Sequence, residues 1–408
     1  MAAVNQYFDA LKLNYLSVSS PLFLWKRPTP ILLKIPLAEG RRRTLVSLQN
    51  EASVQPITPK TTTEQHDFTV DYLVKSCGLS LEAAISTAEK VQFQSPQKPD
   101  LVLALFRNYG FSKTQISKLI RRRPDFLTAN AEKNLMPKLE FFRSIGMSNY
   151  NLAKTLTNDP TILTRSLENH IIPSYEYLKS ILLTNDKVVG SFKRTTWVLL
   201  KDPCKNLGPN IALLREAGVT QKCLSLLLTH FPEAVMQKGE VFGAILRKVS
   251  EMGFDPTKSQ YVLAVHALSG KGNKSIMEKC IEVYKRWGWT EDDILTAFKK
   301  HPNSMMMSER KLMKCMDYFV NQLGLPSRLI AQSPVVLFFS LEKRIIPRCS
   351  VYQVLVSKGL LKEDFSLTNV LLPREERFLD RFITKYEKEV PELLSFYQSK
   401  LNVEVEEA

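Results

Sequence analysis

The chain has 408 residues, of which 44% are hydrophobic and 24% are charged, and its formal net charge at pH 7 is +15. This composition is typical of a globular protein. No uninterrupted apolar run reaches the roughly 18 residues that a membrane-spanning helix requires, so we expect no membrane insertion. The six cysteines include no C-x-x-C pair, and most fall at apolar helix positions, which favours a reducing compartment.

Residues 1–64 differ in composition from everything that follows. They are rich in Ser, Thr, Pro and Leu, and residues 1–60 contain eight basic residues against three acidic ones. An acid-poor, basic N-terminus is typical of an organellar transit peptide. A secretory signal is the competing interpretation, but it would place its positive charge before an apolar stretch and a small-residue cleavage site after it, and this segment shows neither clearly.

A helical unit can be read from residue 117 to residue 148. An amphipathic helix ends in a basic cluster, Pro124 opens a short turn, and Pro137 opens an apolar helix that stops at Gly146. Proline is tolerated at a first helical position because its missing N–H would be unpaired there anyway. Glycine just past a helix accepts the left-handed conformation that closes the last turn. Ser148 can then cap the next helix.

The same signals recur at a fixed spacing. The stop glycines are Gly78, Gly110, Gly146, Gly218, Gly253, Gly288, Gly324 and Gly359. Most gaps are 35 or 36 residues, and the gap of 72 is two periods with the mark missing near Leu182. The internal proline recurs at Pro124, Pro160, Pro232, Pro302 and Pro334, with Thr196 and Ala267 filling its gaps in phase, and Pro137, Pro173 and Pro209 form a second column. Such a period indicates an all-α solenoid.

Two further columns follow the stop glycines. Four residues before each mark is an apolar residue: Val74, Phe106, Phe142, Leu178, Leu214, Val249, Tyr284, Val320 and Leu355. Two residues after most marks is a capping residue: Ser80, Ser112, Ser148, Thr220, Asp255 and Thr290. We expect the apolar column to be core, and Trp197, Trp287 and Trp289 to be mostly core as well.

The chain therefore divides into three parts. Residues 1–64 form the expected transit peptide or disordered segment, and residues 65–390 the repeat domain. Within that domain, the charged amphipathic stretch 374–390 is expected to cap the open end of the array, because terminal units need a polar outer face. Residues 391–408 are expected to be an acidic tail.

No catalytic constellation emerges from the sequence, so we expect no enzyme, no cofactor and no metal site. The segment 270–275 resembles a phosphate-binding loop, but Asn273 stands where that loop needs glycine before its Lys-Ser. His230, His266 and His301 share a phase, yet separate repeats would hold them about 8–10 Å apart, too far to share a metal ion.

Two basic columns remain. The first lies just before the internal turn: Arg121, Arg122, Arg123, Lys193, Arg194, Lys299 and Lys300. The second lies three residues before the stop glycines and includes Lys75, Arg107, Arg143, Lys179, Arg215 and Lys285. If the units stack in register, each column forms a line of positive charge that can contact phosphates. The second column has an alternative explanation, because cations in the last turn of a helix offset its macrodipole.

The repeated patterns PKLEFFRSIGMS (137–148), PNIALLREAGVT (209–220) and KCMDYFVNQLGLP (314–326), with the turns RRRPDFLT and NDPTILT, resemble the mitochondrial transcription termination factor (mTERF) family, and more narrowly its large plant branch. The resemblance covers about residues 66–390. It implies a right-handed-type superhelix of about eight to nine repeats, each of two α-helices and a short 3-10 turn, with a basic concave groove. Departures near Leu182 and Ala267 put the continuity of that groove in question.

The resemblance also implies organellar nucleic-acid binding that regulates gene expression, in transcription termination or in RNA processing and splicing. The partner would be double-stranded DNA or RNA, with other organellar gene-expression proteins as further partners. We expect a monomer in the mitochondrion, with the chloroplast as the alternative. The competing function is a helical-repeat scaffold that binds protein partners in a ribonucleoprotein or ribosome assembly; the positive excess of residues 61–390, 47 basic against 34 acidic, argues against it.

Overall fold

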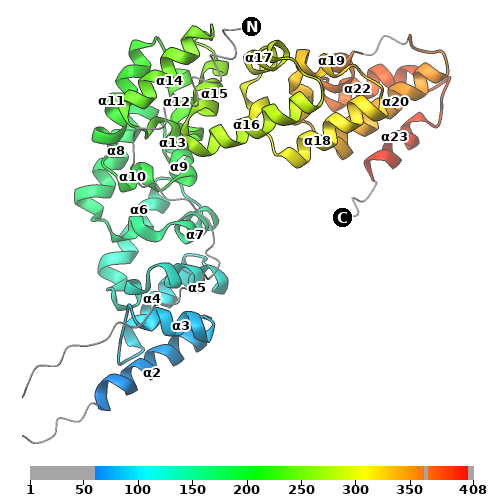
Figure 1. Cartoon of the computed structure of the whole chain (residues 1–408). Helices are drawn as coiled ribbons and strands as arrows, with labels where there is room; N and C mark the ends of the chain where they lie inside the picture. Colours follow the sequence, from blue (N-terminus) through cyan, green and yellow to red (C-terminus); the bar gives the residue numbers. More distant parts are fainter. Residues whose placement is uncertain (1–59, 363–365, 403–408) are drawn as a thin grey trace, which may run out of the picture. The chain divides into compact units, whose positions relative to one another are not determined.

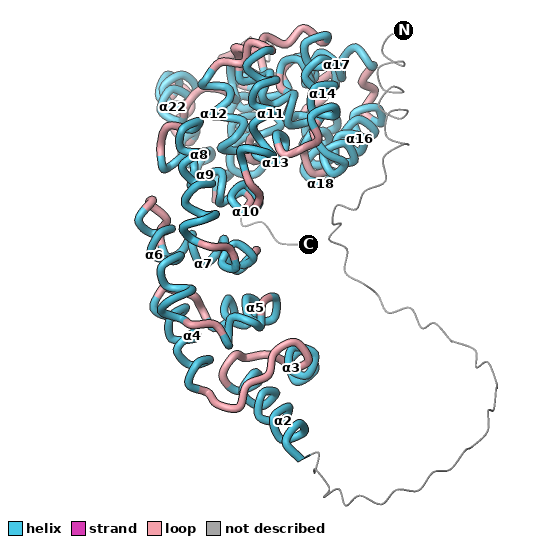
Figure 2. Tube along the Cα trace, turned by 90° about the vertical axis from the view of Figure 1, so that its left-hand side faces the viewer, coloured by secondary structure: helices cyan, strands magenta, loops and turns pink. Residues whose placement is uncertain are grey.

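The computed structural model describes residues 60–362 and 366–402, which contain helices and no strands (Figures 1 and 2). The predicted all-α repeat fold is confirmed. The first helices of the units are α2 (Lys60–Lys75), α4 (Gln97–Asn108), α6 (Met136–Ser144), α8 (Ile172–Leu182), α11 (Pro203–Glu216), α14 (Gly239–Glu251), α16 (Gly270–Arg286), α18 (Glu309–Asp317) and α20 (Ile346–Ser357). These nine helices within the described residues agree with the predicted number of repeats.

Each first helix is followed by a second helix and, in most units, by a short one. The second helices are α3 (Leu81–Ala88), α5 (Lys113–Arg122), α7 (Asn149–Asn158), α9 (Asn185–Arg194), α12 (Gln221–His230), α15 (Ser259–Leu268), α17 (Glu291–Lys300), α19 (Ser327–Gln332) and α21 (Leu367–Leu371). The short helices are η1 (Pro124–Thr128), η3 (Pro160–Thr164), α10 (Trp197–Leu200), α13 (Pro232–Val235), η5 (Pro302–Met306) and η7 (Pro334–Phe338). Four of these are 3-10 turns, whereas α10 and α13 are single α-turns.

The units stack through like helices. Successive second helices pack on one another from α5 through α7, α9, α12, α15 and α17 to α19. First helices do the same from α8 to α11 and α14, and from α16 to α18. Figure 1 shows the two rows beside each other in the middle of the chain, with α8 and α11 in one and α9 and α12 in the other. The second helices therefore form a continuous row from α5 to α19. Side chains at the same position of successive second helices lie along this row.

The stop glycines end their helices as predicted. All eight have positive φ, and the next residue closes the turn. At Gly146 (φ 103°) the Met147 N–H donates to the Phe142 carbonyl oxygen at 3.1 Å, and Met147 is buried. This six-to-one bond with its apolar contact is a Schellman motif. At the missing mark, Leu183 itself takes the left-handed conformation (φ 72°), which costs an L-residue about 1–2 kcal/mol.

The apolar column is buried in seven of its nine positions. Val74 and Val320 are the exceptions and are half-buried. In these two units the closing bond reaches one residue further back, from Leu79 to Leu73 and from Leu325 to Phe319. The π turn η6 (Tyr318–Gln322) adds the extra residue before Gly324. The buried position therefore moves to Leu73 and Phe319, both fully buried.

The two proline columns have separate roles. Each internal proline opens a short helix, as expected. Pro137 and Pro173 follow π turns, η2 (Ala131–Leu135) and η4 (Leu167–Ile171), and Pro347 follows η8 (Leu341–Ile345). The wider turn avoids the clash between a proline ring and the carbonyl of the preceding turn. Pro209 instead lies inside α11.

The unit of α14 and α15 lacks its short helix, at the departure expected near Ala267, as do the first and last units of the described residues, α2 with α3 and α20 with α21. Ala267 is buried inside α15, and α16 begins two residues after α15 ends. The expected cap at Asp255 is also wrong in this unit. Its carboxylate accepts from the Thr257 N–H at 2.8 Å within a turn, and α15 begins later, at Ser259. Ser80, Ser112, Ser148, Thr220 and Thr290 do cap their helices.

Side chains from the first helices, and from the π turn η4 just before α8, fix the ends of the short helices. The Lys138 ammonium donates to the Leu163 carbonyl at 2.6 Å, and the Asn210 amide donates to the Val235 carbonyl at 2.7 Å. His170 Nε2 lies 3.0 and 2.8 Å from the carbonyl oxygens of Leu199 and Leu200. The last carbonyls of a helix lack partners within it, so these contacts hold each short helix against its own unit.

The helices of the structure extend beyond both predicted ends of the repeat domain, residues 65 and 390. Helix α2 begins at Lys60, five residues before the predicted start, and the predicted transit peptide otherwise lies outside the described residues. The stretch 374–390 is not one helix, because α22 (Glu375–Phe382) ends early and η9 (Thr384–Tyr386) follows. The tail contains α23 (Leu393–Leu401), which packs on α20 and buries Leu393 and Tyr397.

Candidate nucleic-acid interface

The cations before the stop glycines, here the stop-glycine cations, are Arg107, Arg143, Lys179, Arg215 and Lys285. They occupy the last turns of the first helices. Several have partners: the Arg143 guanidinium lies 5.7 Å from the Tyr109 ring centroid, Lys179 hydrogen-bonds Asn185, and Lys285 lies 3.7 Å from the Glu291 carboxylate. Arg107 and Arg215 are exposed and have no hydrogen bond or ion pair within the described residues.

The cations before the internal turn, here the turn cations, end α5, α9 and α17. Arg122 donates to the Thr157 carbonyl at 3.2 Å and Lys300 to the Gln332 carbonyl at 2.7 Å. Each thus reaches the end of the next second helix in the row. Arg123 pairs with Asp125 at 2.6 Å; this hydrogen bond raises the pKa of Arg123 and lowers the pKa of Asp125. These three side chains are engaged within the protein.

The other turn cations are Arg121, Lys193, Arg194 and Lys299. They are exposed and have no hydrogen bond or ion pair within residues 60–362 and 366–402. Arg121, Lys193 and Lys299 share one register, but the intervening units carry Thr157, Thr229 and Ala264 there. The turn cations therefore form separate basic clusters along the second-helix row.

An aromatic residue lies beside the second of these clusters. Trp197 opens α10 and is 43% exposed, whereas Trp289 is buried as expected. The prediction that Trp197 is mostly core is wrong. The equivalent position after the internal proline holds Asp125, Thr161, Glu233, Asn303 and Val335 in other units. This mostly polar column was the available signal that the position faces outward.

The histidines do not form a metal site, and no group of three potential metal ligands occurs in the described residues. The His266 ring stacks on Phe231 with centroids 3.9 Å apart. Burial, aided by the charge of Arg194, lowers the pKa of His266 to about 4, and burial lowers the pKa of His301. Both rings are thus neutral at pH 7 and add nothing to the positive surface.

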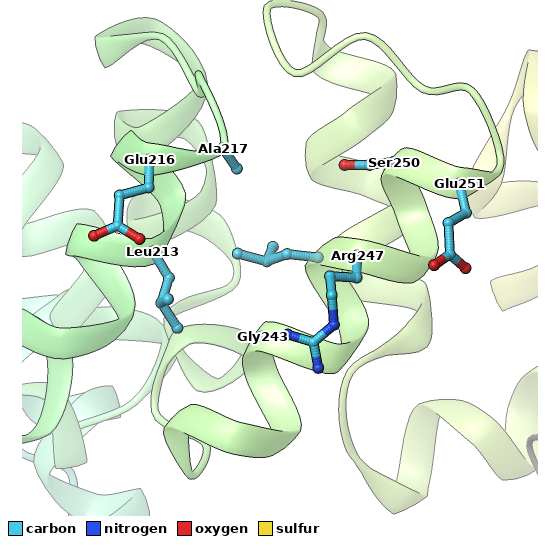
Figure 3. A pocket seen from close by; sticks show the side chains of 8 residues that line it. Leu213, Glu216, Ala217, Gly243, Arg247, Ser250 and Glu251 are labelled. Atoms are coloured by element: carbon cyan, nitrogen blue, oxygen red, sulfur yellow. The ribbon is translucent and has the colours of Figure 1, made fainter.

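Two open hollows lie on the array. One, of about 370 Å³, lies beside α15 and is lined by Phe231, His266, Lys311 and Phe338 among others. The other, of about 410 Å³, lies between α11 and α14 (Figure 3). Leu213 and Gly243 line it. Glu216 and Arg247 also line it. Outside these hollows, burial raises the pKa of the Cys315 thiol to about 11.

The fold and these clusters define an α-solenoid of 35–36-residue units with basic groups on its second-helix row. The mTERF family model matches residues 103–315 and 266–379. These matches together cover more than half of the chain, so the protein belongs to the mTERF family. No described helix is both long and apolar enough to cross a bilayer.

Two curated relatives come from Arabidopsis thaliana. The chain is 25% identical over 174 residues to the chloroplastic transcription termination factor MTERF8, a match that covers 43% of this chain and 34% of the relative. It is 23% identical over 181 residues to the mitochondrial transcription termination factor MTERF15, which covers 41% of each. The chain thus spans less than half the length of the curated relatives it matches.

Proposed function

We propose that this protein binds nucleic acid in an organelle and regulates organelle gene expression there, through transcription termination or RNA processing. The observation that carries the proposal is the group of turn cations Arg121, Lys193, Arg194 and Lys299, exposed and without internal partners. A cation with a structural role usually pairs with a carboxylate or donates to the carbonyl oxygens at a helix end, as Arg122 and Lys300 do. Cations left exposed on one row can neutralise phosphates and release their counterions.

Location and partners follow the same proposal. The relatives are named as chloroplastic and mitochondrial factors of transcription termination. We propose a mitochondrial location, with the chloroplast as the alternative, and residues 1–64 as the transit peptide. The partner is double-stranded DNA or RNA, bound by a monomer and joined by other organellar gene-expression proteins. The proposal requires no enzymatic step and no cofactor.

The second candidate is a scaffold for protein partners. The hollow between α11 and α14 favours it, because Glu216, Glu251 and Arg247 surround an apolar floor at Leu213 and Leu246. Mixed charge around apolar side chains suits a protein surface better than a phosphate chain. We rank this candidate second because the excess of basic residues extends over the whole repeat region.

Ultraviolet crosslinking of the tagged full chain in intact organelles tests the proposal, followed by sequencing of the attached DNA and RNA. We expect organelle sequences to be recovered, and recovery to fall when Arg121, Lys193, Arg194 and Lys299 are all replaced by Gln. A variant with Lys90, Lys98, Lys113 and Lys118 replaced by Gln provides a charge-matched control, because these lysines are exposed and belong to neither column. Co-purified proteins with no crosslinked nucleic acid would contradict the proposal and support the scaffold.

A further inference from the structure

Trp197 is exposed on a helix that is otherwise buried. Val198, Leu199 and Leu200, the other three residues of α10, have at most 4% of their surface exposed, whereas Trp197 has 43%. The three buried side chains already anchor α10 to the core. An exposed indole adds little to that packing, and a polar residue serves at the equivalent position of most other units. The packing of α10 therefore does not account for a tryptophan here.

The backbone that carries this ring is held at both ends of α10. At its start, the Thr196 hydroxyl donates to the Asp159 carboxylate at 2.5 Å. At its end, His170 Nε2 lies 2.8 Å from the Leu200 carbonyl oxygen. Asp159 follows α7 in the preceding unit, whereas His170 belongs to the same unit as α10, so α10 is tied both to its neighbour and to its own unit. A ring on such a support loses little conformational freedom when it binds a ligand.

Positive charge surrounds the ring. The Lys201 ammonium lies 5.2 Å from the indole centroid, and the exposed Lys193 and Arg194 end α9 three to four residues before Trp197. Two acids near the ends of α10 have other roles. Asp159 is bonded to Thr196, and the Asp202 carboxylate caps α11 by accepting from the Cys204 N–H at 3.0 Å. In the next short helix, α13, the position equivalent to Trp197 is Glu233, which is negatively charged. The positive site around Trp197 is therefore limited to α9 and α10.

We propose that this site, defined by Lys193, Arg194, Trp197 and Lys201, binds an unpaired nucleotide of a single strand, with its base stacked on Trp197. The inference rests on the proposed nucleic-acid binding and specifies its ligand. Every base has a π face that an aromatic side chain can stack on, and cations beside the ring contact the flanking phosphates. A duplex keeps its base faces stacked inside and offers them only at its ends. A duplex bound along its side therefore presents no base face to Trp197.

The test measures affinity of the full chain by fluorescence anisotropy at one fixed salt concentration. The probes are an unstructured RNA of about 15 nucleotides, the same sequence as single-stranded DNA, and the two corresponding duplexes. The variants are Trp197→Ala and Trp197→Phe. Tyr150→Ala is the matched control: Tyr150 is 69% exposed, with the Lys154 ammonium 5.9 Å from its ring, but it lies at the start of α7, not beside a short helix.

We expect Trp197→Ala to weaken single-strand binding by about 5- to 150-fold, as the loss of one stacked base does, and to leave duplex binding unchanged. Trp197→Phe should retain most of the affinity, and Tyr150→Ala all of it. Indole emission should be quenched on addition of the single strand, and that quenching should be lost in Trp197→Phe. Comparison of RNA with DNA strands then assigns the source of the nucleotide.

The failures are distinguishable. If Trp197→Ala weakens single-strand and duplex binding equally, or neither, the stacking site is wrong while the proposed function stands. If the wild-type chain binds none of the four probes, the proposed function fails and the stacking site with it. Trp197→Phe keeps an aromatic ring in place, so it separates a loss of stacking from a failure to fold.

Discussion

At the scale of single residues, Phe142 shows how one side chain joins two units. It is fully buried, and its ring stacks on Phe192 from the next second helix with centroids 4.8 Å apart and planes inclined by 9°. Its carbonyl also closes the turn after Gly146. Because the ring fills the space between repeats, its loss leaves a cavity that neither unit can close alone.

We therefore expect Phe142→Ala to lower the free energy of unfolding by about 3–5 kcal/mol. Urea denaturation followed by circular dichroism measures this change. Tyr150→Ala serves as the control, since Tyr150 is exposed and its removal should change stability little. An unchanged unfolding midpoint for Phe142→Ala would mean that the interface between these units is not built as described.

Leu183 is the second residue whose role is sharply defined. It replaces the stop glycine in a left-handed conformation and is 59% exposed. Leu183→Gly should relieve about 1–2 kcal/mol of backbone cost against about 0.5–1 kcal/mol of added chain entropy. We expect a gain of up to about 1.5 kcal/mol, seen as a higher melting temperature, whereas Gly146→Ala should lower the melting temperature. A loss of stability in Leu183→Gly would contradict this account.

At this scale, the sequence predicted the residues that repeat and missed those that do not. Glycines, prolines and apolar positions recur at 35–36 residues because each unit needs the same turn and the same core. Leu183 carries no signal of positive φ, since leucine rarely adopts it. The shift of burial from Val320 to Phe319 results from a π turn, which has no clear mark in the sequence. Trp197 was misassigned because a tryptophan is usually taken as core.

At the scale of elements, the short helices depend on side chains that bond their terminal carbonyls. The C-terminal example is Arg348, which is fully buried. It donates to the Pro373 carbonyl at 2.7 Å and to the Glu375 carboxylate at 2.7 Å, and its guanidinium lies 4.5 Å from the Phe378 ring centroid. Tyr397 donates to the same carboxylate at 2.6 Å. Arg348 thus ties α20, α22 and α23 into one end cap.

Replacement of Arg348 by Met keeps most of its volume but removes every donor. The carbonyls that Arg348 bonds would lose this donor, and a buried acceptor left without a partner costs about 1–3 kcal/mol. The Glu375 side chain is 53% exposed and would still accept from Tyr397. We expect the C-terminal helices to lose protection first in hydrogen exchange, before the repeats around α9. Uniform loss of protection along the whole chain, or no loss at all, would argue against a local end cap.

Element order was predictable, whereas element type was not always so. Proline and glycine specify where each helix begins and ends, which is why the three-part unit emerged from the sequence. The short α-turns at α10 and α13, the π turns and helix α23 depend on tertiary contacts, such as the burial of Leu393 and Tyr397. The acidic composition near the C-terminus concealed α23, because its buried positions are few.

At the scale of the whole molecule, the repeat domain should be separable from the N-terminal segment. Helix α2 begins at Lys60, so a chain that starts there should keep its full helical content and its melting temperature. Far-ultraviolet circular dichroism of this truncation against the full chain measures both. A large loss of helix would show that residues 1–59 contribute to the fold and would refute their assignment as a transit peptide.

For both cation columns, the sequence predicted the positions of the cations but not their partners. Their positions followed from the sequence, but the partners that engage Arg122, Arg123, Lys300 and Lys179 depend on how units stack, and no spacing rule reveals them. The structure narrows the contact candidates to Arg121, Lys193, Arg194 and Lys299 on the second helices, and Arg107 and Arg215 on the first. Their part in binding remains a prediction.

The salt dependence of nucleic-acid affinity tests the central claim most directly. Log affinity is plotted against log salt for the wild type, for the variant with Arg121, Lys193, Arg194 and Lys299 replaced by Gln, and for one with Arg107, Arg143, Lys179 and Arg215 replaced by Gln. On a single strand the first variant should flatten the slope by about 2.8 units, at 0.7 for each of four phosphate contacts. The second should flatten it by about 1.4 units, because two of its cations have partners within the protein. Slopes equal to that of the wild type within error for both variants would contradict phosphate contact by these residues.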